Sequence, residues 1–175
     1  MSAKPAKVSQ PRDGKMIVEK DVQIPMRDGT MLYADIFRPD GGDERFPAIM
    51  NISVYQKDKL WVPPADLGEE ANPYMNWETV NPLWWCPRGY VCVRVDARGA
   101  GRSPGRSEPS SHQEALDFYD AVEWIAKRPW CCGNIGTSGI SYHASSQWRL
   151  ANLQPPSLKA IMPWEGRADQ YRDQA

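Results

Sequence analysis

The sequence predicts an α/β fold built on a mixed, mostly parallel sheet with flanking helices, and two observations carry this prediction. From residue 89 onward, strand-like and helix-like segments alternate, which is the pattern of βαβ units. A short apolar run at residues 47–53 is bounded by turn residues and suits a buried strand. The 175 residues leave room for one domain or for part of a larger one.

The first part of the chain predicts an antiparallel hairpin. Residues 15–24 and 31–37 are strand-like, and an Asp28-Gly29 turn separates them. Residues 1–14 are rich in Lys, Pro and Ser, which is typical of a flexible tail. We therefore expect the domain to occupy residues 15–175.

The segment 56–88 shows no periodicity, and its tryptophans are its most unusual feature. It contains Trp61, Trp77, Trp84 and Trp85 together with several prolines. So long an irregular stretch in a compact domain is usually functional or partly helical. We expect its tryptophans either to form an aromatic wall for a substrate or to pack in the core.

The second half supplies the clearest elements. Residues 89–96 form a predicted strand, and a capping box of Ser111 and Glu114 then opens a helix that ends before Pro129. The apolar face of this helix consists of Ala115, Phe118, Val122 and Ile125. A strand at 134–140, a helix at 142–151 and a strand at 158–163 follow.

Composition excludes several classes of function. Lys and Arg number 21 against 22 Asp and Glu, so the basic footprint of a nucleic-acid-binding protein is absent. No apolar run approaches the ~18 residues of a membrane helix, and the N-terminus does not resemble a secretory signal. These features predict a cytoplasmic protein. The four Cys form no C-x-x-C pair and only two His are present, so we expect buried thiols and neither a metal nor an organic cofactor.

Ser141 is the first candidate for chemistry. It lies between a predicted strand and a predicted helix, and Gly139 precedes it by two positions, as in a nucleophile elbow. His143 breaks the usual G-x-S-x-G pattern. The backbone N–H of Tyr142 would lie at the helix N-terminus, where it could bind an oxyanion. One alternative is that Ser141 only caps the helix. Another is that Ser138, which also suits a packed small residue of the strand, is the nucleophile.

Two further segments follow predicted strands. Tyr55 comes just after the strand at 47–53, so its hydroxyl could point into a cleft, or its ring could be half buried in the core. Residues 96–105 are rich in glycine, but no helix begins on the last glycines, as dinucleotide binding requires. We expect a structured loop in which Asp96 and Arg98 tie down the backbone.

Taken together, three stretches resemble a known family. They are residues 26–39, the Asp-x-Arg-Gly-x-Gly-x-Ser-x-Gly sequence within 89–105, and residues 130–142 leading to the serine. They resemble the Xaa-Pro dipeptidyl-peptidase-like hydrolases, also called the CocE/NonD family. The resemblance implies an α/β-hydrolase fold, represented by its N-terminal portion and therefore incomplete. It also implies Ser141 as nucleophile, the Tyr55 hydroxyl as an oxyanion donor and the Tyr142 N–H as its partner.

The resemblance further implies a serine hydrolase of small esters, amides or short peptides that forms an acyl-enzyme. Family members place the Asp and His of the triad far downstream, beyond the position at which this sequence stops. His143 cannot easily serve as base, because residues i and i+2 of a helix do not face each other, and His112 is expected at the surface. We expect the chain to be a fragment that is inactive alone. The alternative is a truncated, non-catalytic binding module.

Overall fold

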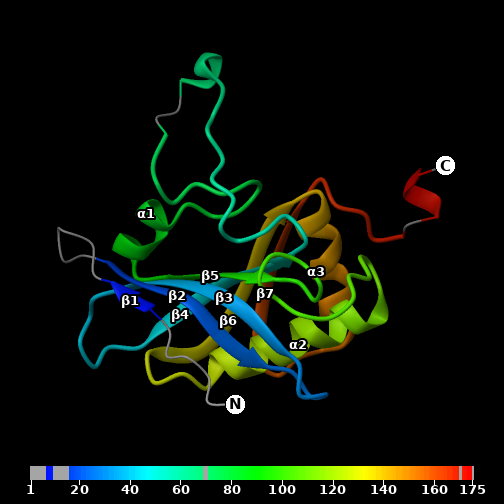
Figure 1. The fold of residues 1–175 in the computed structure, drawn as a ribbon, viewed down its shortest axis with the longest axis horizontal. Coiled ribbons are helices and arrows are strands. Elements are labelled where there is room, and N and C mark those ends of the chain that lie inside the picture. The colour runs from blue at the N-terminus through cyan, green and yellow to red at the C-terminus, as the bar shows by residue number, and fades with distance from the viewer. Residues whose placement is uncertain (1–6, 10–15, 69–70, 170, 175) are drawn as a thin grey trace.

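The computed structural model describes residues 7–9, 16–68, 71–169 and 171–174. Its centre is a seven-stranded sheet (Figure 1). In spatial order the strands are β1 (Lys7–Ser9), β2 (Met16–Pro25), β3 (Met31–Pro39), β5 (Val91–Asp96), β4 (Phe46–Ser53), β6 (Cys131–Ile140) and β7 (Leu158–Trp164). Pairing is antiparallel from β1 to β5 and parallel from β5 to β7. The predicted mixed, mostly parallel sheet is confirmed.

The predicted hairpin is β2 and β3. The turn between them closes as Met26 donates its N–H to the Thr30 carbonyl at 2.8 Å. A β-bulge interrupts the pairing between Glu19 and Val22. Within the segment predicted to be a tail, residues 7–9 form β1 against β2, whereas residues 1–6 and 10–14 lie outside the described part.

Two helices, α2 (His112–Ala126) and α3 (Tyr142–Asn152), pack on each other and on the parallel strands. In Figure 1 they lie together beside β6 and β7. The helix α2 begins where its capping signal predicts, because the Ser111 hydroxyl accepts the Glu114 N–H at 3.1 Å. The Glu114 carboxylate caps Ser110 rather than Ser111, accepting its N–H at 3.0 Å.

The central strands β4 and β5 are buried on both faces of the sheet, and the strand period of two decides which residue enters which core. The main core faces α2, and β5 contributes Val91, Val93 and Val95 to it. The opposite face carries a smaller cluster that includes Cys92 and packs against Trp85 of α1 (Pro82–Trp85). Three of the four cysteines are buried free thiols, and Cys132 is half buried.

In the described part of the predicted irregular segment between β4 and β5, the helical elements are the short turns η1 (Ala65–Leu67), α1 and η2 (Cys86–Arg88). Figure 1 shows it as a long excursion that leaves the sheet and returns to it. Its Trp61 and Trp77 rings meet edge to face at 5.6 Å. They line a cavity of about 470 Å³ together with Trp85, Trp164 and the end of β6.

Candidate active site

The candidate site lies where two neighbouring parallel strands end. β4 and β6 are adjacent in the sheet, and their carboxyl ends therefore meet at one edge, which is where open α/β sheets bind ligands. Tyr55 follows the end of β4 by two residues, and Ser141 follows β6 directly. Both line a cavity of about 240 Å³, whose other lining residues are Ser110, Tyr142, Ser145, Glu165 and Arg167. The fold thus brings together three residues predicted from the sequence.

The backbone of Ser141 is in a strained conformation. Its φ is +57° and its ψ is −113°, a combination that a residue with a side chain adopts only when its surroundings enforce it. The Ser141 N–H is fixed by a 3.0 Å hydrogen bond to the Trp164 carbonyl of β7. Although Ser141 occupies the N-cap position of α3, its side chain makes no capping hydrogen bond. The side chain is exposed to the cavity and does not act as a cap.

Small residues make this sharp turn possible. A Cβ at Gly139 would lie 2.3 Å from the Cβ of His143, so no larger residue fits there without displacement. Ala144 is fully buried, and a Cβ at Gly166 would lie 2.4 Å from its methyl group. A small residue at position 144 thus leaves room for the elements that crowd the elbow.

The Tyr55 hydroxyl and the Ser141 side chain line the same cavity and lie close enough for the serine to lower the pKa of Tyr55. Burial and the negative charge of Glu78 raise the pKa of Tyr55, and the nearby Ser141 side chain offsets only part of this. The phenol therefore remains protonated at neutral pH and keeps a proton to donate. Its ring packs against the rings of Tyr142 and His143, with centroids 5.6 Å and 5.5 Å away.

Tyr142 is the first residue of α3, so helix geometry leaves its N–H without an intrahelical carbonyl. Its side chain is turned toward α2, where the hydroxyl donates a hydrogen bond to the buried Glu114 carboxylate. Burial and the Glu114 charge raise the pKa of Tyr142. This contact joins the two helices and fixes the start of α3 beside Ser141.

Neither histidine lines the cavity at Ser141. His143 is buried, and burial together with the Arg94 charge lowers its pKa to about 4. It is therefore neutral at pH 7 and packs beneath Tyr55 instead of facing the serine hydroxyl. His112 is exposed at the first position of α2.

The glycine-rich loop after β5 and the turn that carries Tyr55 are both hydrogen-bonded to Asp96. The Asp96 carboxylate accepts backbone N–H groups from Lys57 at 2.7 Å and from Arg102 at 3.0 Å. A Cβ at Gly101 would lie 2.2 Å from this carboxylate, which explains the glycine. Asp96 ties down the backbone as expected, whereas Arg98 instead binds side chains, with two hydrogen bonds to Asp117 of α2.

Sequence reasoning missed the charged residues beside the turn that carries Tyr55. Lys57 and Asp35 are fully buried and form an ion pair at 3.1 Å, with Asp21 and Asp58 also bonded to Lys57. The available signal was an aspartate inside the apolar strand pattern of residues 31–37, because a carboxylate there is rarely buried without a cationic partner.

Within the described ranges, no helix is long and apolar enough to cross a bilayer. In the same part of the chain, His, Cys, Asp and Glu side chains do not gather into a group of three that could hold a metal ion.

Comparison with known proteins identifies the family. Residues 28–175 match the family described as X-Pro dipeptidyl-peptidase (S15 family). The chain belongs to this family. The cocaine esterase of Rhodococcus sp. is 35% identical to this S15 chain over 162 residues, which are 91% of the chain and 25% of the esterase.

Solved structures agree with this assignment. A CocE/NonD family hydrolase from Staphylococcus aureus superposes with a TM-score of 0.83 at 40% identity, and the match covers 98% of the S15 chain and 32% of that hydrolase. An α-amino-acid ester hydrolase superposes with a TM-score of 0.69 at 24% identity, which supports the fold alone. The chain thus has the N-terminal part of an α/β-hydrolase fold, and it spans about a quarter to a third of the length of these relatives.

Proposed function

We propose that the chain supplies the nucleophile and the oxyanion donors of a serine hydrolase that acts on small esters, amides or short peptides. One observation carries the proposal most directly. Ser141 is held at a positive φ between β6 and α3, its hydroxyl is free of any capping bond, and Tyr55 lies beside it in the same cavity. A serine that only capped a helix would need neither a strained backbone nor the neighbouring Tyr55 hydroxyl. The esterase relative and the family match agree with this class of reaction.

The proposed reaction follows from this geometry. The Ser141 oxygen attacks the substrate carbonyl carbon, and its proton passes to a histidine base. The bond to the leaving alcohol or amine then breaks, the base returns the proton to that group, and an acyl-serine ester remains. Water hydrolyses the ester by the same route and regenerates the serine.

The tetrahedral oxyanion would be bound by the Tyr55 hydroxyl and the Tyr142 N–H. The two donors come from different elements, and both lie beside Ser141. Since they are fixed before the substrate arrives, they stabilise the charge that develops in the transition state. The raised pKa of Tyr55 keeps its proton available over the whole physiological range.

The base and its aspartate are proposed to come from residues outside this chain, since neither His112 nor His143 lines the serine cavity. The relatives are three to four times longer than the matched region, which leaves room for both groups.

The direct test is the Ser141→Ala variant of the full-length protein, assayed with a p-nitrophenyl ester. We expect kcat to fall by about 10⁶, the scale seen when a triad serine is removed. Ser138→Ala is the matched control, because Ser138 is buried within β6 and does not line the serine cavity. A loss below tenfold in Ser141→Ala would contradict the assignment and favour a non-catalytic binding module.

A further inference from the structure

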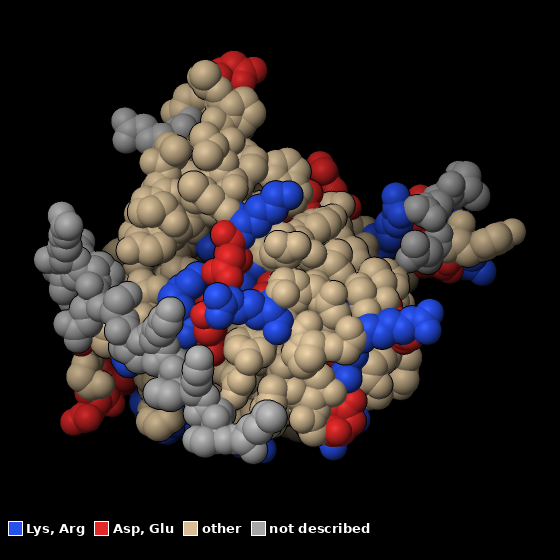
Figure 2. Space-filling view, viewed as in Figure 1, with Lys and Arg blue, Asp and Glu red and all other residues tan. Residues whose placement is uncertain are grey.

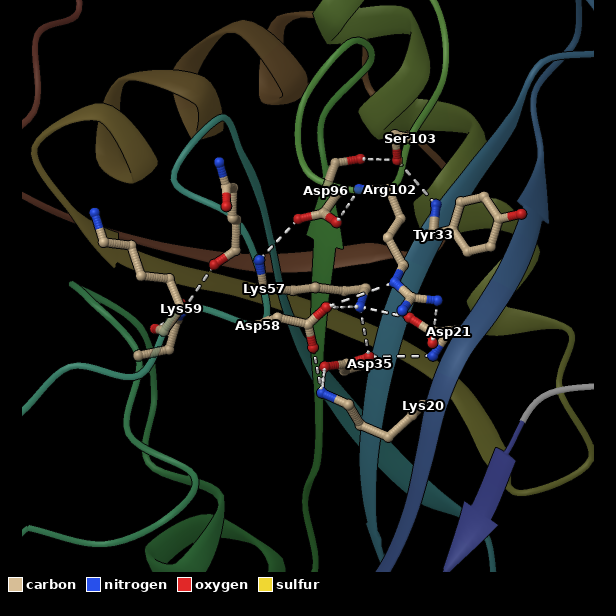
Figure 3. A network of polar contacts seen from close by, with 12 residues as sticks. Lys20, Asp21, Tyr33, Asp35, Lys57, Asp58, Lys59, Asp96, Arg102 and Ser103 are labelled. Carbon is tan, nitrogen blue, oxygen red and sulfur yellow. Dashed lines mark hydrogen bonds and ion pairs between the residues drawn. The ribbon is translucent and has the colours of Figure 1, made fainter.

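We infer that Lys57 is a positioning residue that holds the Tyr55 hydroxyl against Ser141 through a buried cluster of ion pairs. The inference rests on the proposed oxyanion role of Tyr55. Figure 3 shows the cluster, in which Lys57 reaches from the turn after β4 toward carboxylates on β2 and β3.

The Lys57 ammonium is completely buried and is shared by three carboxylates. Its Nζ lies 2.8 Å from Asp21, 3.1 Å from Asp35 and 2.8 Å from Asp58. Burial alone would lower the pKa of Lys57, but the three carboxylates outweigh burial and raise it. The lysine is therefore charged, and each of its N–H donors has a carboxylate partner.

Two outer cations complete the cluster. Lys20 pairs with Asp35 and Asp58, and Arg102 pairs with Asp21 at 2.8 Å. Three cations thus meet three carboxylates, which is the condition under which buried charges are tolerated. Figure 2 shows basic and acidic side chains intermixed near the middle of the face seen there.

The β-bulge in β2 serves this arrangement. It lies between Glu19 and Val22, so it presents Lys20 and Asp21 to the cluster. Asp21 has a φ of +59°, and its N–H donates to the Asp35 carboxylate at 3.2 Å. Bulges next to active sites commonly re-aim side chains, and this one aims a carboxylate at Lys57.

The cluster anchors the turn that carries Tyr55. The Tyr55 N–H donates to the Ser53 hydroxyl at 3.1 Å, and the Lys57 N–H donates to Asp96 at 2.7 Å. Between them, Gln56 is held at a φ of +71°, which persists only where the surroundings over-determine it. Lys57 is the side-chain anchor next to this strained residue. Without its ion pairs the turn can relax and carry the Tyr55 hydroxyl away from Ser141.

A positioning role differs from general structural support in one measurable way, which is that the effect of Lys57 must pass through the Tyr55 hydroxyl. A displacement of about 1 Å at a catalytic group can cost about a hundredfold in rate. Once the hydroxyl has been removed, moving its ring should matter little.

The test is a double-mutant cycle in the full-length protein, with Lys57→Met and Tyr55→Phe alone and combined, assayed with a p-nitrophenyl ester. We expect Lys57→Met to lower kcat by about ten- to a hundredfold while KM changes by less than about threefold. In the Tyr55→Phe background, the same substitution should change kcat by less than about threefold. Lys59→Met, an exposed lysine two residues away, is the control and should retain the wild-type kcat.

Lys57→Met leaves three carboxylates facing two cations, so the charge-balanced variant Lys57→Met/Asp35→Asn is measured beside it. We expect this variant to recover part of the lost thermal stability but none of the lost kcat.

Three results would overturn the inference. The first is an equal loss of kcat in both backgrounds, and the second is a wild-type kcat in a folded Lys57 variant. The third is failure of the charge-balanced variant to fold, which would make the cluster a folding determinant only. If Tyr55→Phe alone left kcat unchanged, the proposed oxyanion role of Tyr55 would be wrong. The inference about Lys57 would then be wrong too, because it rests on that role. If Tyr55→Phe lowered kcat but its effect simply added to that of Lys57→Met, only the inference about Lys57 would be wrong, and the oxyanion role of Tyr55 would stand.

Discussion

The backbone at Ser141 adopts a positive φ, at a cost of about 1–3 kcal/mol, although the sequence places no glycine there. Such strain persists only where neighbouring contacts enforce it, and here the Trp164 carbonyl and the tight packing at Gly139 do so. Tyr55 meets the resulting exposed hydroxyl. The backbone strain at this one residue lowers local stability, and it holds the Ser141 hydroxyl at the end of the sheet.

Replacing Tyr55 with phenylalanine removes one hydrogen-bond donor and leaves the ring in place. If the donor acts mainly in the transition state, kcat should fall by about 10²–10³ with little change in KM. Steady-state kinetics of Tyr55→Phe in the full-length protein would measure both. A raised KM at constant kcat would mean that the hydroxyl only binds substrate.

His143 predicts a specific dependence of stability on pH. Burial lowers its folded pKa to about 4, below the ordinary value of 6.5, so the unfolded chain binds more protons between these two values. The free energy of unfolding should therefore rise with pH across this window, with a total contribution from His143 of about 3 kcal/mol, and this contribution should be fully lost below about pH 4.

Urea unfolding of the chain and of His143→Leu at several pH values would measure this contribution. The difference between the two curves isolates His143 from the buried carboxyls, such as Glu114, whose pKa burial raises. A difference that does not vary between pH 4 and 6.5 would contradict the neutral buried imidazole.

At the scale of elements, the junction of β6 and α3 determines where the serine stands. Gly139 and Gly136 lie on the same strand but differ in their surroundings. A Cβ at Gly139 would meet His143 at 2.3 Å, whereas at Gly136 the nearest contact would be an ordinary 3.8 Å.

Gly139→Ala should therefore destabilise the chain by about 1–3 kcal/mol through overpacking, and it should also displace the elbow. Gly136→Ala should cost clearly less. Thermal unfolding of the two variants would compare them, and equal losses would show that crowding at the elbow is not the reason for the glycine.

Most elements could be predicted from the sequence because their signals are local. The hairpin, β4 and α2 follow from the turn at Asp28-Gly29, an apolar run and the cap at Ser111. The sequence predicts a strand from residue 134, whereas β6 begins three residues earlier, at Cys131. In the structure, Cys131 already pairs with Phe46 of β4, so tertiary pairing extends the strand.

At the scale of the whole molecule, the site joins residues that are distant in sequence, since 86 positions separate Tyr55 from Ser141 (141 − 55). Their meeting could be anticipated because the carboxyl ends of neighbouring parallel strands share one edge. The cluster around Lys57 could not, because its members come from β2, β3, the turn after β4 and the loop after β5. No local pattern specifies which aspartate a lysine will meet across a sheet.

Activity also depends on the whole molecule, because a serine nucleophile needs a base from elsewhere in the fold. The 175-residue chain contains two histidines, one exposed at the start of α2 and one buried below Tyr55. We therefore expect this chain alone to hydrolyse p-nitrophenyl esters no faster than its Ser141→Ala variant. Turnover in the wild-type chain only would reveal a base within these residues.

The central claim is that Ser141 is an activated nucleophile, and labelling by a fluorophosphonate tests it most directly. The full-length protein would be labelled across a range of pH, and the adduct located by peptide mass spectrometry. We predict an adduct on Ser141 whose rate of formation rises as a histidine base loses its proton near neutral pH. A serine without assistance would react slowly, at a rate matching that of the denatured protein, and that result would contradict the account.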